Sequence, residues 1–226
     1  MSTNYPNDYD SYPTWQDLVD IIAAAIINNI QDAIVAIEHE LGKNPSGDFS
    51  TVKERLDSMG AGGMWAKVEE VDLTAAATEY TFSGLDGDND KLYKLIARVI
   101  CGVTGYNRIA LRFNGDTGYN YGWGGFYQEG GTISADNGAD TGYCQIMVCP
   151  HCTMGAFIEA LIYPVSGHER QLITRGGERS PGYAGRFCHF NGYWENDTDN
   201  ITSITILSTV TNGLGAGTHL ELWKRT

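Results

Sequence analysis

Five apolar residues that repeat at alternating spacings of three and four constrain this chain more than any other feature: they are Ile27, Ile30, Ile34, Ile37 and Leu41. This alternation is the core pattern of a coiled coil, in which heptad positions a and d face the partner helices. Isoleucine at both core positions favours three or four helices over two. The sequence therefore predicts that these residues form the seam of a trimeric helical stalk. The alternative is an amphipathic helix that packs on a globular domain of its own chain.

The limits of this helix can be read from capping residues. It is expected to run from Thr14, which can cap its start, to Leu41, which a glycine follows. An Asn-Pro-Ser-Gly turn comes next, and a second short helix is expected over residues 50–59, capped by Asp48 or Ser50. A glycine-rich hinge should then separate the helices from the rest of the chain.

Composition and charge exclude several classes of protein. The net charge of −13 repels phosphate backbones, so no nucleic acid is expected as a partner. The apolar run at residues 21–27 is far shorter than the roughly 20 residues that cross a bilayer, so no membrane insertion is expected. The acidic opening at residues 1–10 does not resemble an ordinary secretion signal. The five cysteines suggest no disulfide framework and fit synthesis in a reducing cytoplasm.

Composition changes after the glycine cluster at residues 60–63. Short alternating segments, separated by Gly, Asn and Asp, predict strands over residues 65–72, 80–85, 91–101, 108–114, 122–128, 143–149, 156–165, 170–174, 185–190, 202–209 and 219–224. Strands of this length and spacing predict an antiparallel, jelly-roll-like β-sandwich. The expected fold is therefore mainly β, with an N-terminal α-helical coiled-coil stalk and a C-terminal β-sandwich head.

Two stretches resemble known proteins. The pattern YPTWQDLVD…IQDAIVAIEHELGKNPSGDFSTVKERLD, with its IEHELG-NPSG core, resembles the N-terminal segment of tailed-phage virion proteins: tail fibres, head fibres and receptor-binding proteins. FSGLDGDNDKLYKLIARVI and THLELWKR resemble, more weakly, a β-sandwich head that often follows this segment. The resemblance implies a virion-attachment segment at residues 1–13, a trimerisation stalk at 14–60 and a head at 64–226. It also implies a virion protein assembled in the host cytoplasm.

Aromatic residues interleaved with glycine and asparagine offer a candidate glycan-binding site. Flat rings on a loop or strand edge can stack on sugar rings, while amides and hydroxyls supply hydrogen bonds. The candidates are Tyr119, Tyr121, Trp123, Tyr127, Tyr193 and Trp194. The alternative is that these rings fill the sandwich core or a trimer contact.

Metal and redox chemistry have weaker candidates. Cys149 and Cys152 form a Cys-Pro-His-Cys motif, but a redox site needs a helix after the first cysteine, and the following segment is predicted as a strand. Zinc binding by these cysteines, with Cys144, His151, Cys188 or His189, stays open beside a plain strand-end turn. The carboxylates of Asp86, Asp88 and Asp90 resemble the opening of a calcium loop. The rest of the EF-hand pattern is missing, which favours a hairpin turn, and no cofactor is expected.

The function expected from the stalk and the resemblance is that of a homotrimeric phage fibre or spike. Its head is expected to bind a host surface glycan or protein, and its N-terminus to contact other virion proteins. A head fibre or capsid decoration protein without a specific receptor is the first alternative, and a polysaccharide depolymerase the second. No enzymatic activity is expected, because nucleophile-elbow and phosphate-loop motifs do not occur in the sequence.

Overall fold

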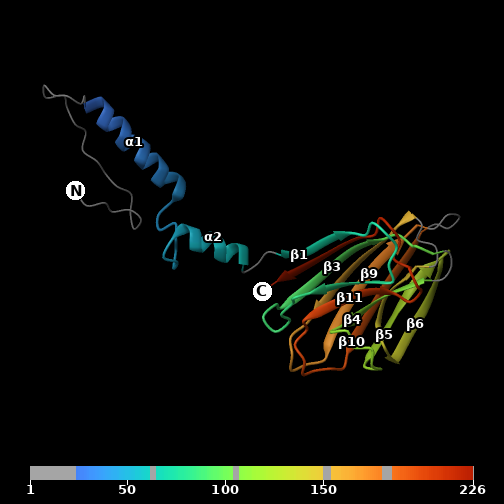
Figure 1. Cartoon of the computed structure of the whole chain (residues 1–226). Coiled ribbons are helices and arrows are strands. Elements are labelled where there is room, and N and C mark those ends of the chain that lie inside the picture. Colours follow the sequence, from blue (N-terminus) through green and yellow to red (C-terminus); the bar gives the residue numbers. More distant parts are fainter. Residues whose placement is uncertain (1–23, 62–64, 104–106, 150–153, 180–184, 226) are drawn as a thin grey trace. The chain divides into compact units, whose positions relative to one another are not determined.

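The chain forms two compact units, which we describe separately. The computed structural model describes residues 24–61, 65–103, 107–149, 154–179 and 185–225 (Figure 1). The first unit covers Met1–Gly60 and the second Ala61–Thr226. The first contains the helices α1 (Ala24–Leu41) and most of α2 (Val52–Ala61). The second unit consists of β-strands.

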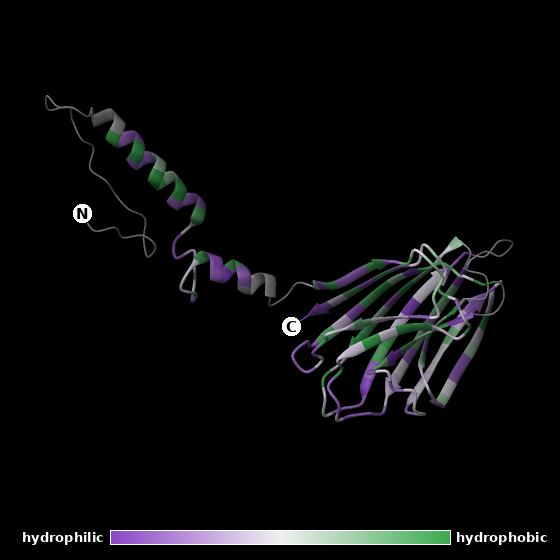
Figure 2. Ribbon diagram, in the orientation of Figure 1, coloured by the Kyte–Doolittle hydropathy of each residue, from purple (hydrophilic) through white to green (hydrophobic). Residues whose placement is uncertain are grey.

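Helix α1 carries the predicted seam on its surface. The part of the expected helix before Ala24 lies outside the described residues. Apolar bands alternate with polar ones along α1 in Figure 2, and Ile30 and Ile37 are 55% and 59% exposed. The helix ends as expected, because Gly42 adopts a φ of 76° and its N–H donates to the carbonyl of Glu38 at 2.8 Å.

Helix α2 begins with a different cap from the one expected. The Thr51 hydroxyl accepts a hydrogen bond from the backbone N–H of Glu54 at 3.1 Å, and the Glu54 carboxylate accepts from the N–H of Ser50 at 3.0 Å. These bonds satisfy one amide of the first turn and one just before the helix, as in a capping box. The prediction of Asp48 or Ser50 as the cap was therefore wrong, and α2 ends at Ala61 rather than at residue 59.

Within the described residues, twelve strands form two antiparallel sheets. The strands are β1 (Ala66–Asp72), β2 (Glu79–Ser83), β3 (Leu92–Val99), β4 (Asn107–Phe113), β5 (Tyr121–Glu129), β6 (Thr132–Thr141), β7 (Cys144–Cys149), β8 (Ala156–Tyr163), β9 (Arg170–Glu178), β10 (Arg186–Trp194), β11 (Ser203–Ser208) and β12 (His219–Arg225). The larger sheet has the order β1-β12-β3-β8-β9-β10-β5-β6 and the smaller β2-β11-β4-β7. The predicted mainly β fold and its antiparallel sandwich are confirmed.

Two hairpins enlarge one of these sheets. Without β5–β6 and β9–β10, the remaining strands form four-stranded sheets in the orders β1-β12-β3-β8 and β2-β11-β4-β7. That is the connectivity of a jelly roll, in which successive strands alternate between the two sheets except at β4 and β7, which are neighbours in the smaller sheet. Both hairpins extend the larger sheet beyond β8. The smaller sheet stays at four strands, so the extended sheet presents a broad outer face.

The sequence prediction found eleven of these strands and missed β6. Its sequence, TISADNGADT, is polar and rich in turn formers, and its side chains are exposed or half-buried. An edge strand needs no apolar side chains, because hydrogen bonds to β5 hold it in the sheet. Gly138 leaves room for the ring of Trp123, since a Cβ atom there would lie 2.8 Å from that ring.

The space between the sheets is filled by side chains that alternate along each strand. The fully buried large residues include Phe82, Tyr93, Phe113, Phe190 and Trp194. Trp194 packs on Phe113 with ring centroids 5.6 Å apart. Burial of these rings supplies much of the stability of the head, at about 25 cal/mol per Å² of apolar surface removed from water.

One buried carboxylate makes the stability of the head depend on pH. Burial raises the pKa of Glu178 to about 7, although the Arg186 guanidinium, 3.7 Å from its carboxylate, opposes the shift. The folded state therefore holds a proton that the unfolded chain releases near pH 4.5. This contribution is complete below pH 4.5 and is lost as the pH rises through about 7.

We expect the free energy of unfolding to fall by about 3 kcal/mol between pH 4.5 and 7 through this group. Urea unfolding at pH 5.0 and 7.5 measures the change. In Glu178→Gln the side chain keeps its shape but cannot ionise. The difference in pH dependence between wild type and variant therefore reports Glu178 alone, without the contribution of the histidines. Equal pH slopes in the two proteins would show that Glu178 ionises freely in the fold.

Candidate binding face on the large sheet

The outer face of the eight-stranded sheet exposes large apolar side chains. Along β8, β9 and β10, inward residues are buried, whereas outward residues are exposed or half-buried. The outward set includes several large apolar residues at 39% exposure or more: Phe126, Ile133, Phe157, Tyr163, Ile173 and Phe187. Single exposed apolar residues are common on protein surfaces, but a group on one face indicates a site of interaction.

A slot lies between two phenylalanines of this face. Strand pairing places Phe157 of β8 and Phe187 of β10 on either side of Gly177 of β9. Two strand spacings separate the phenylalanine backbones by about 10 Å, and the glycine leaves the floor between them open. The hollow has a volume of about 450 Å³, and Glu159 and Arg175 close one end. A flat ring or a short side chain fits between such walls.

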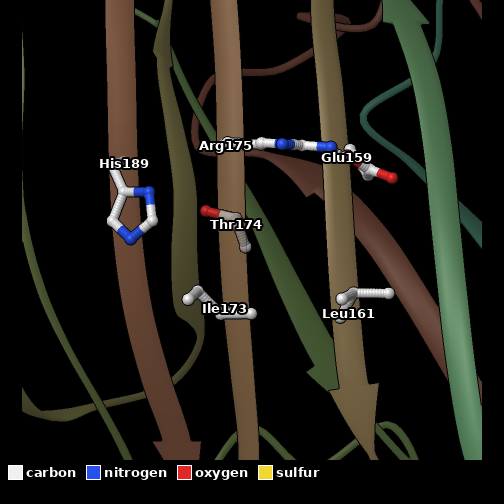
Figure 3. A pocket seen from close by; sticks show the side chains of 6 residues that line it. All are labelled: Glu159, Leu161, Ile173, Thr174, Arg175 and His189. Atoms are coloured by element: carbon white, nitrogen blue, oxygen red, sulfur yellow. Dashed lines mark hydrogen bonds and ion pairs between the residues drawn. The ribbon is translucent and has the colours of Figure 1, made fainter.

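Charged and polar groups occupy the centre of the face. Figure 3 shows the Arg175 side chain extending across the sheet toward Glu159, with which it forms an ion pair. His189 stacks on Phe126, with ring centroids 5.8 Å apart. Arg175 and His189 line a second hollow of about 260 Å³, together with Ile173. The imidazole and the guanidinium supply hydrogen-bonding groups to its lining.

A third hollow continues this surface toward the other end of β8 and β9. It has a volume of about 410 Å³ and is lined by Tyr163, Gln171, Ile173 and Asn191, among others. The three hollows follow the strands, so they form one shallow surface that combines apolar floors with amide and charged edges. Such a surface suits a ligand that presents both apolar faces and hydrogen-bonding groups.

The hollows contain few carboxylates. Among the described residues that line them, Glu159 is the one carboxylate, and its partner is a cation. Glycoside hydrolysis uses two carboxyl groups on opposite sides of one bond. The face therefore offers contacts but not that pair.

The aromatic residues proposed from sequence for glycan binding divide into two groups. Tyr121, Trp123 and Trp194 are at most 6% exposed and belong to the core, so their prediction as stacking surfaces was wrong. The small sheet covers these three rings. Tyr121 and Trp194 also stack on each other, with their ring planes 15° apart. In addition, the Trp194 indole N–H donates to the Asp116 carboxylate at 2.8 Å.

The other three aromatic candidates reach the surface to different degrees. Tyr119 is exposed on the loop before β5. Tyr127 is half-buried, and the Arg186 guanidinium lies 5.4 Å from its ring centroid. Tyr193 is half-buried and its ring lies over Gly122. They come from different strands and loops, and the structure does not bring them together as one aromatic site.

Sequence reasoning missed the exposed apolar residues on the outer face of the large sheet. The signal was present in β8, AFIEALIY, and in β10, RFCHFNGYW, where apolar residues occupy both alternating sets. In a strand with one solvated face, only one set should be apolar. Phe157 and Phe187 could therefore have been recognised as apolar residues that point away from the core.

The candidate calcium loop has another role. Asp86 accepts hydrogen bonds from the side chains of Asn89 and Asn200, which hold its pKa below the usual value. Asp88 accepts from the backbone N–H of Ser166 at 2.7 Å. Each carboxylate is thus directed at a different partner, and the arrangement is that of a turn that ties neighbouring loops together.

Asp90 completes the same turn. It is buried, accepts a hydrogen bond from the Tyr93 hydroxyl at 2.7 Å and pairs with Lys224 at 2.9 Å. The three aspartates therefore do not converge on one point. Their use as calcium ligands, one of the two readings drawn from the sequence, does not fit this geometry.

The cysteines depart from the expectation that the chain has no disulfide. Cys101 is disulfide-bonded, whereas Cys144 and Cys188 are free, buried thiols. Since the chain has five cysteines, Cys149 and Cys152 remain as possible partners. Both free thiols are buried, and burial raises their pKa, to about 11 for Cys188. Residues 150–153 lie outside the described part of the chain.

Comparisons with known proteins add no family to this description. No protein-family model matches the chain, and no curated protein matches it. Among the described residues, neither helix combines the length and the apolar character that a bilayer crossing requires. The fold and its outer face therefore carry the functional argument.

Proposed function

We propose that this chain is a homotrimeric virion appendage of the tailed-phage type, whose β-sandwich head binds a host surface glycan. The helical unit forms the trimer as a coiled-coil stalk. The segment before it contacts other virion proteins. The outer face of the large sheet holds the ligand.

The exposed seam of α1 is the observation that carries this proposal. Ile27, Ile30, Ile34, Ile37 and Leu41 are each between 36% and 59% exposed in the single chain. Full burial of one such side chain is worth about 1.5–3 kcal/mol, so leaving the whole stripe in water is costly. Partner helices of identical sequence offer the same stripe with heptad spacing, and they would bury it.

The shape and chemistry of the head face support glycan binding. The slot between Phe157 and Phe187 has walls about two strand spacings apart, which suits a sugar ring. Arg175, His189 and Asn191 stand beside the slot and the hollows and can bond to hydroxyl groups. A single shallow site of this kind binds weakly, but three sites on one stalk gain avidity on a repetitive surface.

The disulfide at Cys101 is consistent with a protein that works outside the cell. Disulfides persist in oxidising surroundings and are rare in a reducing cytoplasm. A virion protein is made in the cytoplasm and is exposed to the outside after release. Oxidation of Cys101 after release would stabilise the head where it binds.

Solution mass tests the trimer directly. Light scattering after size exclusion should give about three times 24.7 kDa for the full chain. Ile30→Asp/Ile37→Asp places two charges in the seam and should give the monomer mass. Asn29→Asp/Ala36→Asp adds the same charges, also seven residues apart, away from the seam and should remain trimeric. A wild-type monomer would remove the stalk from the proposal.

Binding to an array of bacterial surface polysaccharides tests the head. The intact protein should bind a subset of the array, and Phe157→Ser/Phe187→Ser should lower that binding at least about 100-fold, since avidity multiplies the loss at each site. Tyr119→Ser removes an exposed ring from the loop before β5, which lines none of the three hollows of the face, and should bind as wild type does. A trimer that binds nothing on the array would favour the head fibre or decoration protein without a receptor.

A further inference from the structure

At the β1 edge of the outer face, three side chains converge on one point. Glu70 belongs to β1, and His219 and Glu221 belong to β12. One potential ligand atom from each lies within 4.8 Å of the others, and this is the one such group found among the described residues. The cluster combines an imidazole nitrogen with two carboxylate oxygens, which is a donor set that transition-metal ions accept.

The spacing of these atoms matches a small tetrahedral ion. His219 Nε2 lies 3.0 Å from Glu221 Oε1 and 3.8 Å from Glu70 Oε1. Ligands bound tetrahedrally at 2.0–2.1 Å from Zn²⁺ are separated by about 3.3–3.4 Å, which lies between the two distances. The ligand atoms of Glu70 and Glu221 lie within 4.8 Å of each other, so a bound ion would draw these two carboxylates together.

Each of these ligands is oriented by a further residue. His219 Nδ1 lies 2.8 Å from the Asp72 carboxylate, which leaves Nε2 directed at the cluster. Glu221 Oε2 accepts a hydrogen bond from the Trp223 indole at 2.7 Å, which leaves its Oε1 toward His219. Carboxylate–histidine pairs of this kind are the usual support of protein-bound zinc, because they fix the tautomer and the orientation of the ring.

Glu70 is supported in the same way. Its Oε2 forms an ion pair with Lys67, while its Oε1 faces His219. All three potential ligands thus use one atom for an outside partner and direct the other inward. This division leaves one donor atom of each residue for a shared ion, as in metal sites whose ligands are oriented by outer partners.

The strand register explains why the sequence brings these residues together. Glu70 pairs with Glu221 and Asp72 with His219 across β1 and β12. Side chains two residues apart on a strand share a face, so the four residues form a square on the outer face of the sheet. The sequence alone hid this site, because its ligands lie about 150 residues apart.

We propose that Glu70, His219 and Glu221 form a three-ligand Zn²⁺ site, with Asp72 as the positioning residue for His219. A fourth position stays open to water or to an oxygen of a bound ligand. The ion would join β1 to β12 at the edge of the large sheet, independently of the proposed trimer and of glycan binding. Calcium is disfavoured because it takes six to eight oxygen ligands at 2.3–2.6 Å, and one donor here is nitrogen.

Titration calorimetry on the full chain, stripped of metal with a chelator, tests the site with ZnCl₂ alone. We expect one Zn²⁺ per chain, at least about 100-fold weaker binding in His219→Gln, and about 10- to 100-fold weaker binding in Asp72→Asn. His189→Gln removes another histidine of the same face and should bind as wild type does. CaCl₂ should give no comparable heat.

Thermal unfolding supplies the second measurement. Zn²⁺ should raise the melting temperature of the wild type and of His189→Gln but not that of His219→Gln, whose fold is checked by its unfolding transition without metal. The proposal is overturned if the wild type binds no Zn²⁺ at a concentration of about 100 μM. It is equally overturned if binding persists in His219→Gln and is lost in Cys152→Ser, which would place the ion at the cysteine motif.

Discussion

Replacing Arg170 with methionine is expected to lower the free energy of unfolding of the head by about 4–5 kcal/mol. The Arg170 side chain is completely buried at the start of β9. Its guanidinium donates to the backbone carbonyls of Pro164, His168 and Asn196 at 3.2, 3.0 and 2.7 Å, and also to that of Asp199. Methionine fills similar volume but donates no hydrogen bond.

The size of the effect follows from the carbonyl groups that would be left behind. Each buried acceptor that loses its donor costs about 1–3 kcal/mol. Arg170 holds together the loop before β9 and the loop after β10, so part of the cost is relieved if these loops move to reach water. The guanidinium also lies 5.8 Å from the centroid of the Trp194 ring, a cation–π contact that methionine weakens.

Urea unfolding measures this prediction against a control on the same strand. Arg175→Met makes the same chemical change at a position that is 70% exposed, and it should change stability by less than about 1 kcal/mol. Arg170→Lys keeps a charge but not the planar set of donors and should lie between wild type and methionine. Equal stabilities for the two methionine variants would show that the carbonyl groups near Arg170 find water instead.

The sequence predicted the alternation of the strands better than the role of each face. Period-two patterns found eleven strands, because alternation along β3 or β12 is a local property. Alternation does not show which set a second sheet covers. For that reason the sequence predicted Tyr121 and Trp194 as surface rings, although the small sheet buries them.

Contacts between distant residues explain the other departures. The β6 strand contains turn formers, and it is held by its pairing with β5 rather than by its own propensity. The four acceptors of Arg170 and the cluster around His219 depend on loops and registers that join remote segments. Neither leaves a motif of fixed spacing, so neither could be found by reading along the chain.

Removing the disulfide at Cys101 is expected to lower the melting temperature of the head by about 10 °C. With Cys149 or Cys152 as the partner, the bond closes a loop of about 50 residues, which restricts the unfolded chain by about 4 kcal/mol in the chain-entropy treatment. A transition in a unit of this size shifts by about 2–4 °C for each kcal/mol. The loss therefore exceeds that of an ordinary surface substitution.

The wild type and two variants, each measured with and without reductant, separate the effect of the disulfide from the effect of losing a cysteine side chain. Cys101→Ala should melt at the same temperature with and without dithiothreitol, whereas the wild type should melt lower when the reductant is present. Cys188→Ala removes a buried free thiol and should lose stability through packing while keeping the full response to reductant. If the wild type and Cys101→Ala respond equally, the bond does not form in solution. The stability of the head would then come from the sandwich core alone, and the case for a role outside the reducing cytoplasm would lose its support from Cys101.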